Sequence, residues 1–436
     1  MPGGVIDLIS IGPHDEVLTP IKVNENGKVS PPDVSIFEGI SYTYDRFEME
    51  TVSAQATGTS NFGQTVQYTL LKAGDLISNM YLEVNLPSIA VDAGNVGWCH
   101  QIGHYLFSEI TFKVGGLEIQ KLRSQFSDIW ARLTVDKNQR DAYNEMIGET
   151  VVYNIIGPGA TVTTTVYDSP QKKDSVKPAF KIIVPMKLFF CEFWANALPI
   201  CALSFNILNV EIKYRNFSDM LIYYDGADSS NLTTTPQIGN TTMWVEYVFV
   251  PNNTRSRFID YRLQYSFCQI QDNGENGFPV NQINPRVILT QKLPICEIIY
   301  FVQEDAARAA NHWEHYDVWT GNPDLFPIPQ ILESHIYISG SSRQDQRTWH
   351  YHARQLLYDR HTVVPQSRSI NAFIWATYPE ERYPMGTSNF TRIQQPELQI
   401  QLNSIDTTHP GKLYVFARNI QFFEINAGYS QLGFAL

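Results

Sequence analysis

Two pairs of closely spaced histidines are the first places in this chain to look for chemistry. His100 and His104 stand four residues apart, the spacing at which two imidazoles on one helix face can bind a metal. Gly103 lies between them, the segment leads into a strand-like run, and no third ligand follows nearby. His312 and His315 lie in a polar segment and are interpreted as surface or interface rings. We therefore predict no metal site.

The usual signatures of catalysis and phosphate binding are also missing. GxSxG, GxGxxG and P-loop motifs do not occur in the sequence. Gly115 and Gly116 lack a following phosphate-binding helix, so we interpret them as a tight turn between strands. Glu380 and Glu381 fit a solvated loop, and residues 272–277 fit a turn, because they lack the acidic ligands of a calcium loop. We predict no catalytic residue and no cofactor, and thus no enzyme.

Five asparagines begin Asn-x-Ser/Thr sequons, which accept glycans in secreted proteins. They are Asn216, Asn231, Asn240, Asn252 and Asn389. The N-terminal residues lack the basic region and long apolar core of a signal peptide. We interpret the five asparagines as polar loop residues and keep them as the only candidate modification sites.

Charge and apolar patterning exclude further classes of function. The 436 residues carry a formal net charge of −12, and no basic stretch is longer than Lys172-Lys173, which argues against direct contact with nucleic acid. The most hydrophobic region, residues 182–212, is interrupted by charged residues and prolines, so no membrane-spanning helix is expected and any membrane contact is indirect. Five cysteines without a CxxC pair predict free thiols and folding in a reducing compartment.

The elements that would position these residues are mostly strands. Alternation of apolar and polar residues, the period of a half-buried strand, recurs through both halves of the chain. Expected strands include residues 47–52, 66–70, 77–86, 110–119, 161–167, 180–184, 203–214, 243–250, 262–267, 287–293, 297–303, 335–338, 372–377, 397–402 and 413–425. Residues 124–147 have helical spacing, with Ser124 as the expected N-cap.

The chain divides at a turn-like cluster, residues 251–254. We expect an N-terminal arm over residues 1–40, a first domain over 41–252 and a second over 253–436. About eight short strands in each half, without strand–helix alternation, predict an all-β protein. The expected fold is two tandem eight-stranded antiparallel jelly rolls with short helices in the loops. The 23 tyrosines and eight tryptophans exceed what two small cores need, which favours a protein that assembles with others.

Several stretches, in collinear order, resemble the major capsid proteins of nucleocytoplasmic large DNA viruses. Residues 73–87 resemble that family's "GDLI" strand, residues 103–119 its glycine–histidine and double-glycine segment, and Trp130 stands where the following helix has an aromatic residue. Residues 184–203 and 210–213 resemble "VPLxFWF…LPLIAL" and "HEVKI". Residues 332–334, 378–381, 386–393 and 414–419 resemble "LES", "PEE", "SGTxNFSRID" and the C-terminal strand.

The N-terminal region departs from this pattern. Residues 36–46 carry Glu38 where the family usually has lysine, and the preceding arm is longer by about a dozen residues. The departure leaves a minor or vertex-associated capsid paralogue of the same fold as an alternative.

The resemblance implies a structural capsid subunit that performs no reaction. It implies a homotrimer whose six barrels form a pseudo-hexagonal tile in the icosahedral shell of a large double-stranded DNA virus. The implied partners are neighbouring capsomers, minor capsid proteins and the penton, with indirect contact to an internal membrane and none to nucleic acid. The protein would be made in the host cytoplasm and reside in the virion. A β-sandwich carbohydrate-binding protein, or a scaffold used transiently in assembly, is the competing interpretation.

Overall fold

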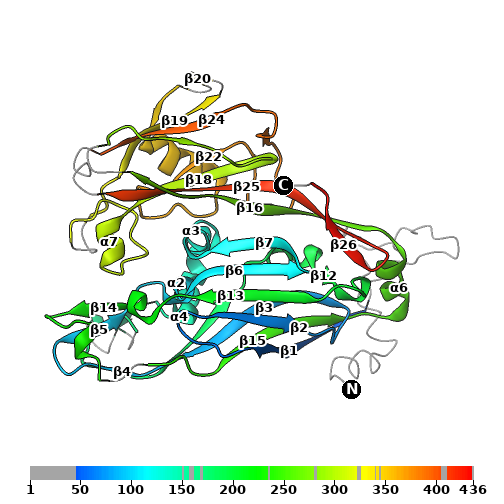
Figure 1. Ribbon diagram of the computed structural model, residues 1–436, viewed down its shortest axis with the longest axis horizontal. Coiled ribbons are helices and arrows are strands. Elements are labelled where there is room, and N and C mark those ends of the chain that lie inside the picture. The colour runs from blue at the N-terminus through cyan, green and yellow to red at the C-terminus, as the bar shows by residue number, and fades with distance from the viewer. Residues whose placement is uncertain are drawn as a thin grey trace.

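The computed structural model describes residues 46–149, 152–156, 162–166, 170–233, 236–278, 282–321, 326–338, 340–342, 345–403 and 410–434. Strands dominate, and they form two β-sandwich bodies that lie one above the other in Figure 1. The N-terminal half of the chain builds the lower body and the C-terminal half the upper one. The predicted arm, residues 1–40, lies outside the described residues.

The first body contains eight main strands in two sheets. They are β1 (Glu48–Thr57), β2 (Thr65–Leu70), β3 (Leu76–Leu86), β6 (Phe107–Val114), β7 (Leu117–Arg123), β11 (Phe180–Pro185), β13 (Leu208–Tyr214) and β15 (Thr241–Phe249). One sheet has the order β11-β3-β15-β1 and the other β2-β13-β6-β7. Strand β1 joins the sheets, because it pairs with β15 as far as Ala54 and with β2 from Gln55.

The second body repeats this arrangement. Its main strands are β16 (Leu263–Phe278), β17 (Arg286–Ile288), β18 (Pro294–Glu304), β19 (Ile331–Ile338), the short β20 (Ser341–Ser342) and β21 (Arg347–Thr348), β22 (Asn371–Ile374), β24 (Pro396–Leu402) and β25 (Gly411–Asn426). The sheets have the orders β16-β25-β18-β22 and β17-β24-β19-β20, with β21 also on β19. Counted along the chain, with β20 and β21 as the fifth strand, both bodies read 1-8-3-6 and 2-7-4-5. The predicted pair of eight-stranded antiparallel jelly rolls is therefore confirmed.

Helices occupy equivalent connections in the two jelly rolls. Between the fifth and sixth strands the first carries α3 (Ser124–Thr134), α4 (Lys137–Ile147) and a hairpin of β8 (Val152–Ile156) and β9 (Val162–Val166). The second carries the π-helix η5 (Tyr351–Gln355) and α8 (Leu356–Arg360) there. Helices α2 (Ile102–Tyr105) and α7 (Asp305–Ala309) both follow third strands. No helix in the described ranges is long and apolar enough to cross a membrane.

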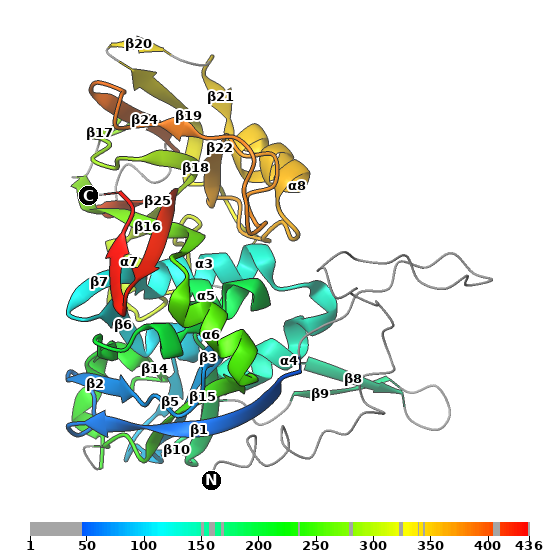
Figure 2. The same ribbon diagram turned by 90° about the vertical axis from the view of Figure 1, so that its right-hand side faces the viewer.

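The remaining short elements line the loops of both bodies. They are β4 (Ile89–Ala90), β5 (Asn95–Trp98), β10 (Val176–Lys177), α5 (Phe189–Glu192), η1 (Trp194–Asn196), β12 (Leu198–Pro199), η2 (Ile200–Ala202), η3 (Phe217–Met220), β14 (Leu221–Tyr224), η4 (Ser229–Asn231), α6 (Asn252–Asp260), β23 (Ser388–Asn389) and β26 (Tyr429–Leu432). Figure 2 shows the hairpin β8–β9 projecting from one side of the molecule.

The strand predictions succeed where alternate residues face a core. In β3, Met80, Leu82 and Val84 are fully buried while the residues between them are not. The turn at Gly115-Gly116 is also confirmed, because both glycines have positive φ, 58° and 86°, as a two-residue turn between β6 and β7 requires.

Four local predictions were wrong. Ser124 is the first residue of α3 rather than its N-cap, and its hydroxyl donates to Gln125 instead. The cluster at 251–254 is the start of α6, since the fixed φ of Pro251 suits a helix entry. Residues 272–277 lie inside β16, where an irregularity in pairing replaces the expected turn. The strand expected from residue 203 begins only at Leu208, after η2.

Candidate functional site

The two jelly rolls meet through the equivalent connections of their folds. The Val363 N–H, just after α8, donates to the Leu133 carbonyl of α3 at 2.9 Å. The Tyr105 hydroxyl of α2 lies 2.6 Å from the hydroxyl of Tyr316 in the loop after α7. One hydrophobic core cluster contains residues of both bodies. We call this contact zone the seam, and it is the most elaborate polar site of the described residues.

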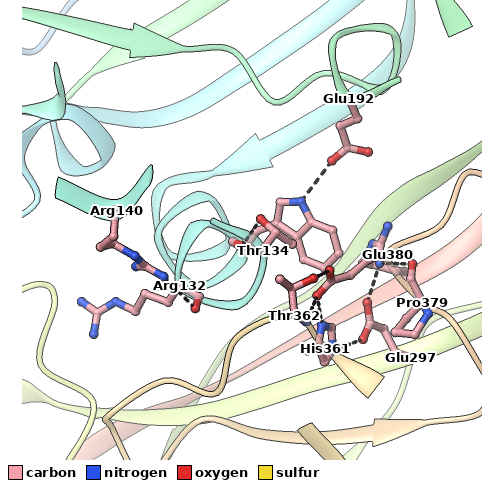
Figure 3. A network of polar contacts seen from close by, with 11 residues as sticks. Arg132, Thr134, Arg140, Glu192, Glu297, His361, Thr362, Pro379 and Glu380 are labelled. Atoms are coloured by element: carbon pink, nitrogen blue, oxygen red, sulfur yellow. Dashed lines mark hydrogen bonds and ion pairs between the residues drawn. The ribbon is translucent and has the colours of Figure 1, made fainter. Parts of the chain in front are cut away.

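Trp130 of α3 occupies the centre of the seam. Its indole N–H donates to the Glu192 carboxylate of α5 at 3.0 Å, and the Arg418 guanidinium of β25 lies 3.9 Å from its ring centroid. Figure 3 labels Glu192, Glu297, His361 and Glu380 of the surrounding network. A buried cation over a tryptophan face contributes on the order of 2 kcal/mol. The stacking holds a strand of the second body against a helix of the first.

A chain of charges continues from Arg418 into the second body. Its guanidinium donates to the Glu297 carboxylate of β18 at 2.6 Å, in register because Glu297 and Arg418 are strand partners. The same carboxylate lies 3.0 Å from Nε2 of His361, whose Nδ1 lies 2.8 Å from the Glu380 carboxylate. Charged residues are rarely buried unless they are paired in this way.

Burial and charge pairing shift the pKa values of Glu297 and His361 in opposite directions. Burial alone would raise the pKa of Glu297, but His361 and Arg418 outweigh it and lower that pKa to about 2. Burial would likewise lower the pKa of His361, but Glu297 and Glu380 raise it to about 9. At neutral pH the seam therefore contains a carboxylate, an imidazolium and a guanidinium, all charged.

Glu380, the last member of this network of charges, holds the surface loop after β22 in place. Glu380 accepts hydrogen bonds from Thr362, from its backbone N–H at 2.9 Å and from its hydroxyl at 2.5 Å, besides its contact with His361. The Pro379 carbonyl accepts a hydrogen bond from Arg418 at 2.8 Å. The prediction of a solvated loop at Glu380 was wrong, because this carboxylate closes the network shown in Figure 3.

A second polar cluster lies on the other side of α3. The Asp128 carboxylate, which has no exposed surface, accepts from the Tyr105 hydroxyl at 2.9 Å, the Tyr316 hydroxyl at 2.7 Å and Arg132 Nε at 2.9 Å. Arg132 also donates to the Glu314 carbonyl at 3.2 Å. These contacts join three segments from both bodies.

The C-terminal hairpin adds a third tie. Strand β26 turns back from β25 and reaches the first body, as Figure 1 shows. The Phe205 N–H donates to the Gly428 carbonyl at 3.3 Å, and the Phe205 ring stacks on Tyr429 with centroids 5.0 Å apart. The Asn206 amide donates to the Ser430 hydroxyl at 2.5 Å.

This arrangement stabilises one relative orientation of the two bodies. The side chains of Glu297 and His361 have no exposed surface, so a substrate cannot reach them. Every charge in the chain from Arg418 to Glu380 already has a protein partner. The seam therefore joins the two barrels through buried and paired groups.

The structure separates the paired histidines of the sequence. His104, inside α2, hydrogen-bonds with the Tyr143 hydroxyl at 3.1 Å, and burial lowers its pKa to about 4. His100 faces Glu149 at 2.9 Å and lies 6.2 Å, between ring centroids, from His312 of the other body. His315 packs on Trp319, but His312 is buried, so the interpretation of the second pair as surface or interface rings was wrong for His312. Within the described ranges no group of three or more His, Cys, Asp or Glu side chains could hold a metal.

The five sequon asparagines differ in exposure. Asn231 is half-buried and its side chain accepts from the Asp228 N–H, whereas the other four are exposed. Asn389 also accepts from the Thr391 N–H of its own sequon at 3.1 Å. They are spread over both bodies and form no common site.

The aromatic residues are distributed between core and surface. Tyr68, Tyr105, Tyr214, Tyr247, Tyr300, Tyr316 and Tyr414 are among the largest fully buried side chains. The expectation that tyrosine exceeds the needs of the cores is therefore only partly right. The five cysteines are free thiols, and two of them, Cys99 and Cys296, are buried.

Two protein families together match nearly the whole chain. The family "Major capsid protein N-terminus" matches residues 35–251, and the family "Large eukaryotic DNA virus major capsid protein" matches residues 254–430. Among curated proteins, the major capsid protein of Pyramimonas orientalis virus is 23% identical over the full length of both chains, and that of Phaeocystis pouchetii virus is 22% identical, also over the full length of both.

Solved structures share the fold. A chain of the PBCV-1 virus capsid superposes with a TM-score of 0.74 at 18% identity and covers 92% of this chain and 100% of its own. The Faustovirus major capsid protein gives 0.73 at 13% identity, over 91% of this chain and 93% of its own.

Proposed function

The chain belongs to the major capsid proteins of large eukaryotic DNA viruses, and we propose that three copies close into a pseudo-hexagonal capsomer of an icosahedral shell. The observation that supports this most is the repeated strand order, 1-8-3-6 and 2-7-4-5, in two barrels tied by a buried network. Three such rigid pairs supply six barrels around one threefold axis. A cyclic trimer is closed, so it leaves no unsatisfied copy of its main interface.

The proposed division of the chain is an arm over residues 1–40, a first jelly roll over 41–252 and a second over 253–436. The main strands of the first body end with β15 at Phe249, and those of the second begin with β16 at Leu263. Helix α6 lies between them and packs near η2.

The proposed partners follow from a shell built of many tiles. They are neighbouring capsomers, minor capsid proteins and the penton, with only indirect contact to an internal membrane. A net charge of −12 opposes direct binding of the genome, because DNA carries the same sign. Free thiols suit synthesis in the reducing host cytoplasm. The role is structural, and the buried state of the seam charges supports the absence of catalysis.

Native mass in solution tests this proposal. Light scattering of the purified chain should give three times 49.7 kDa, about 150 kDa, and negative-stain images of that peak should show a hexagonal outline. A clean monomer at all concentrations would contradict the autonomous trimer and favour an assembly-dependent paralogue of the same fold. Abundance in purified virions separates the major subunit from a minor or vertex paralogue, which would be present at a small fraction of the shell mass.

A further inference from the structure

Five large apolar side chains lie exposed at one end of the first body, where the C-terminal hairpin reaches it. They are Leu71, Leu117, Phe205, Ile207 and Tyr429, and each is between 43 and 67% exposed. We call them the end patch. Contiguous exposed apolar surface of this kind marks a contact site.

The members of the end patch adjoin around Ile207. The Gly115 N–H donates to the Ile207 carbonyl at 2.8 Å, and Leu117 begins β7 two residues later. Strands β2 and β13 pair up to their ends, which places Leu71 next to Ile207. The stacked rings described above, two residues further along, complete the patch.

The chain enters β1 at this same end of the first body. Glu50, near the start of β1, is the strand partner of Tyr247, and the Tyr247 hydroxyl donates to the Leu71 carbonyl at 2.5 Å. The next residue, Lys72, donates from Nζ to the Ser204 carbonyl at 2.9 Å. The segment that precedes β1 therefore joins the described chain beside the end patch.

The segment before β1 contains a sequence run suited to an apolar surface. Residues 5–11 read Val-Ile-Asp-Leu-Ile-Ser-Ile, five apolar side chains in seven, whereas solvated linkers are poor in such residues. Residues 12–47, which connect the run to β1, span up to about 120 Å when extended, so the run can reach the end patch of its own chain. A tethered segment binds at an effective concentration in the millimolar range, well above that of a second copy in dilute solution.

We propose that residues 5–11 dock on the end patch of their own chain. Apolar contact selects this occupant and charge does not, because the exposed Lys72 and Glu118 beside the patch have opposite signs. Docking covers the exposed side chains and ties the N-terminal arm to the end of the barrel at which β1 begins. The contact lies within one chain, so it does not depend on the proposed trimer.

Photo-crosslinking of the full chain tests the contact. Phe205→p-benzoylphenylalanine places a reactive probe in the end patch, and the control Ile288→p-benzoylphenylalanine places it on β17 of the second body, where Ile288 is 62% exposed. Lys22 is the first basic residue of the chain, so trypsin releases the run within the peptide of residues 1–22. After irradiation the probe at 205 should be joined to that peptide, and the probe at 288 should not. The crosslinked chain should still run as a 49.7 kDa monomer on a denaturing gel, because both partners belong to one chain.

Variants of the run give a matched comparison with the probe at 205. Leu8→Asp with Ile9→Asp should lower the crosslink yield at least about tenfold, because an unpaired carboxylate weakens apolar docking by a factor of ten or more. Asn24→Asp with Asn26→Asp adds the same charge outside the run and should leave the yield unchanged. A covalent dimer on the gel would overturn the assignment to the same chain and make a second copy the occupant. No crosslink to residues 1–22, or an equal one from the probe at 288, would overturn the end patch as the docking surface.

Discussion

Removal of Arg418 should destabilise the protein more than removal of any comparable surface arginine. Arg418 is 3% exposed, donates to Glu297 at 2.6 Å and to the Pro379 carbonyl at 2.8 Å, and covers the Trp130 ring. In Arg418→Met the methionine retains part of the apolar stem, but Glu297 is left in the interior with only His361 as partner. Breaking a buried pair in this way costs about 3–5 kcal/mol.

The chain contains a matched control. Arg286 also pairs with a carboxylate, that of Glu397 at 3.6 Å, and also lies over an aromatic ring, Tyr337 at 4.5 Å, but its side chain is 53% exposed. Solvent screens that pair, so Arg286→Met should cost no more than about 1 kcal/mol. The two variants remove the same groups and differ chiefly in burial.

Urea unfolding, monitored by tryptophan fluorescence, measures the difference in the free energy of unfolding between the two variants. The unfolding transition of Arg418→Met should move to lower denaturant with an unchanged slope, and a scanning calorimeter should show it about 4–5 °C lower for a chain of this size. Equal losses for Arg418→Met and Arg286→Met would refute the idea that the buried network holds the seam. A lower slope would instead indicate that the two barrels had begun to unfold separately.

Two further perturbations address the charge and the backbone of the same region. The pKa of His361 is about 9 in the folded protein and 6.5 in its ordinary state. Because the folded pKa is the higher one, protonated His361 contributes fully to the free energy of unfolding below pH 6.5, and this contribution is lost as the pH rises through 9. Wild-type stability should therefore fall by roughly 3 kcal/mol across that interval, and urea titrations of His361→Gln should show a flat profile there. Gly386 has φ of +102°, and an added Cβ would meet the Trp375 carbonyl oxygen at 2.7 Å, whereas at Gly116, with φ of +86°, it would meet nothing within 4 Å. Gly116→Ala should lower the free energy of unfolding by about 1–2 kcal/mol through backbone strain alone. Gly386→Ala should lower it further, because its Cβ also meets the Trp375 carbonyl oxygen. Equal melting temperatures for the two variants would contradict that clash.

The strand pattern could be predicted because burial on one face of a sheet imposes a period of two. In β24, Leu398, Ile400 and Leu402 are buried and the residues between them are not. The alternation of apolar and polar residues therefore predicts this strand from the sequence alone. Helix α6 was missed for the opposite reason. Its nine residues bury only Thr254, so no apolar period marks it, and Pro251 with two asparagines imitates a turn.

The seam could not be predicted, because its residues come from distant parts of the chain: α3, α5, β18, residues 361–380 and β25. One signal was nevertheless present. Glu297 and Arg418 are charged residues inside the apolar runs of β18 and β25, and such residues are rarely buried unless they are paired. Two opposite charges in neighbouring strands of one predicted jelly roll indicate an ion pair. That Trp130 would lie over this pair depends on the orientation of the two bodies, which no local pattern encodes.

Two barrels with the same strand order need directional contacts to fix their relative orientation. Both jelly rolls have the same strand order, and the connections that meet at the seam are equivalent, α3 and α4 in one and η5 and α8 in the other. Apolar packing alone specifies an angle between two similar bodies only weakly, since it is not directional. The cation–ring contacts are directional: Arg418 of the second body lies over Trp130 of the first, and Arg215 of the first lies 4.1 Å from the ring centroid of Trp313 of the second. A network of this kind adds little net stability compared with apolar packing. Its contribution is to fix the relative orientation of the two barrels.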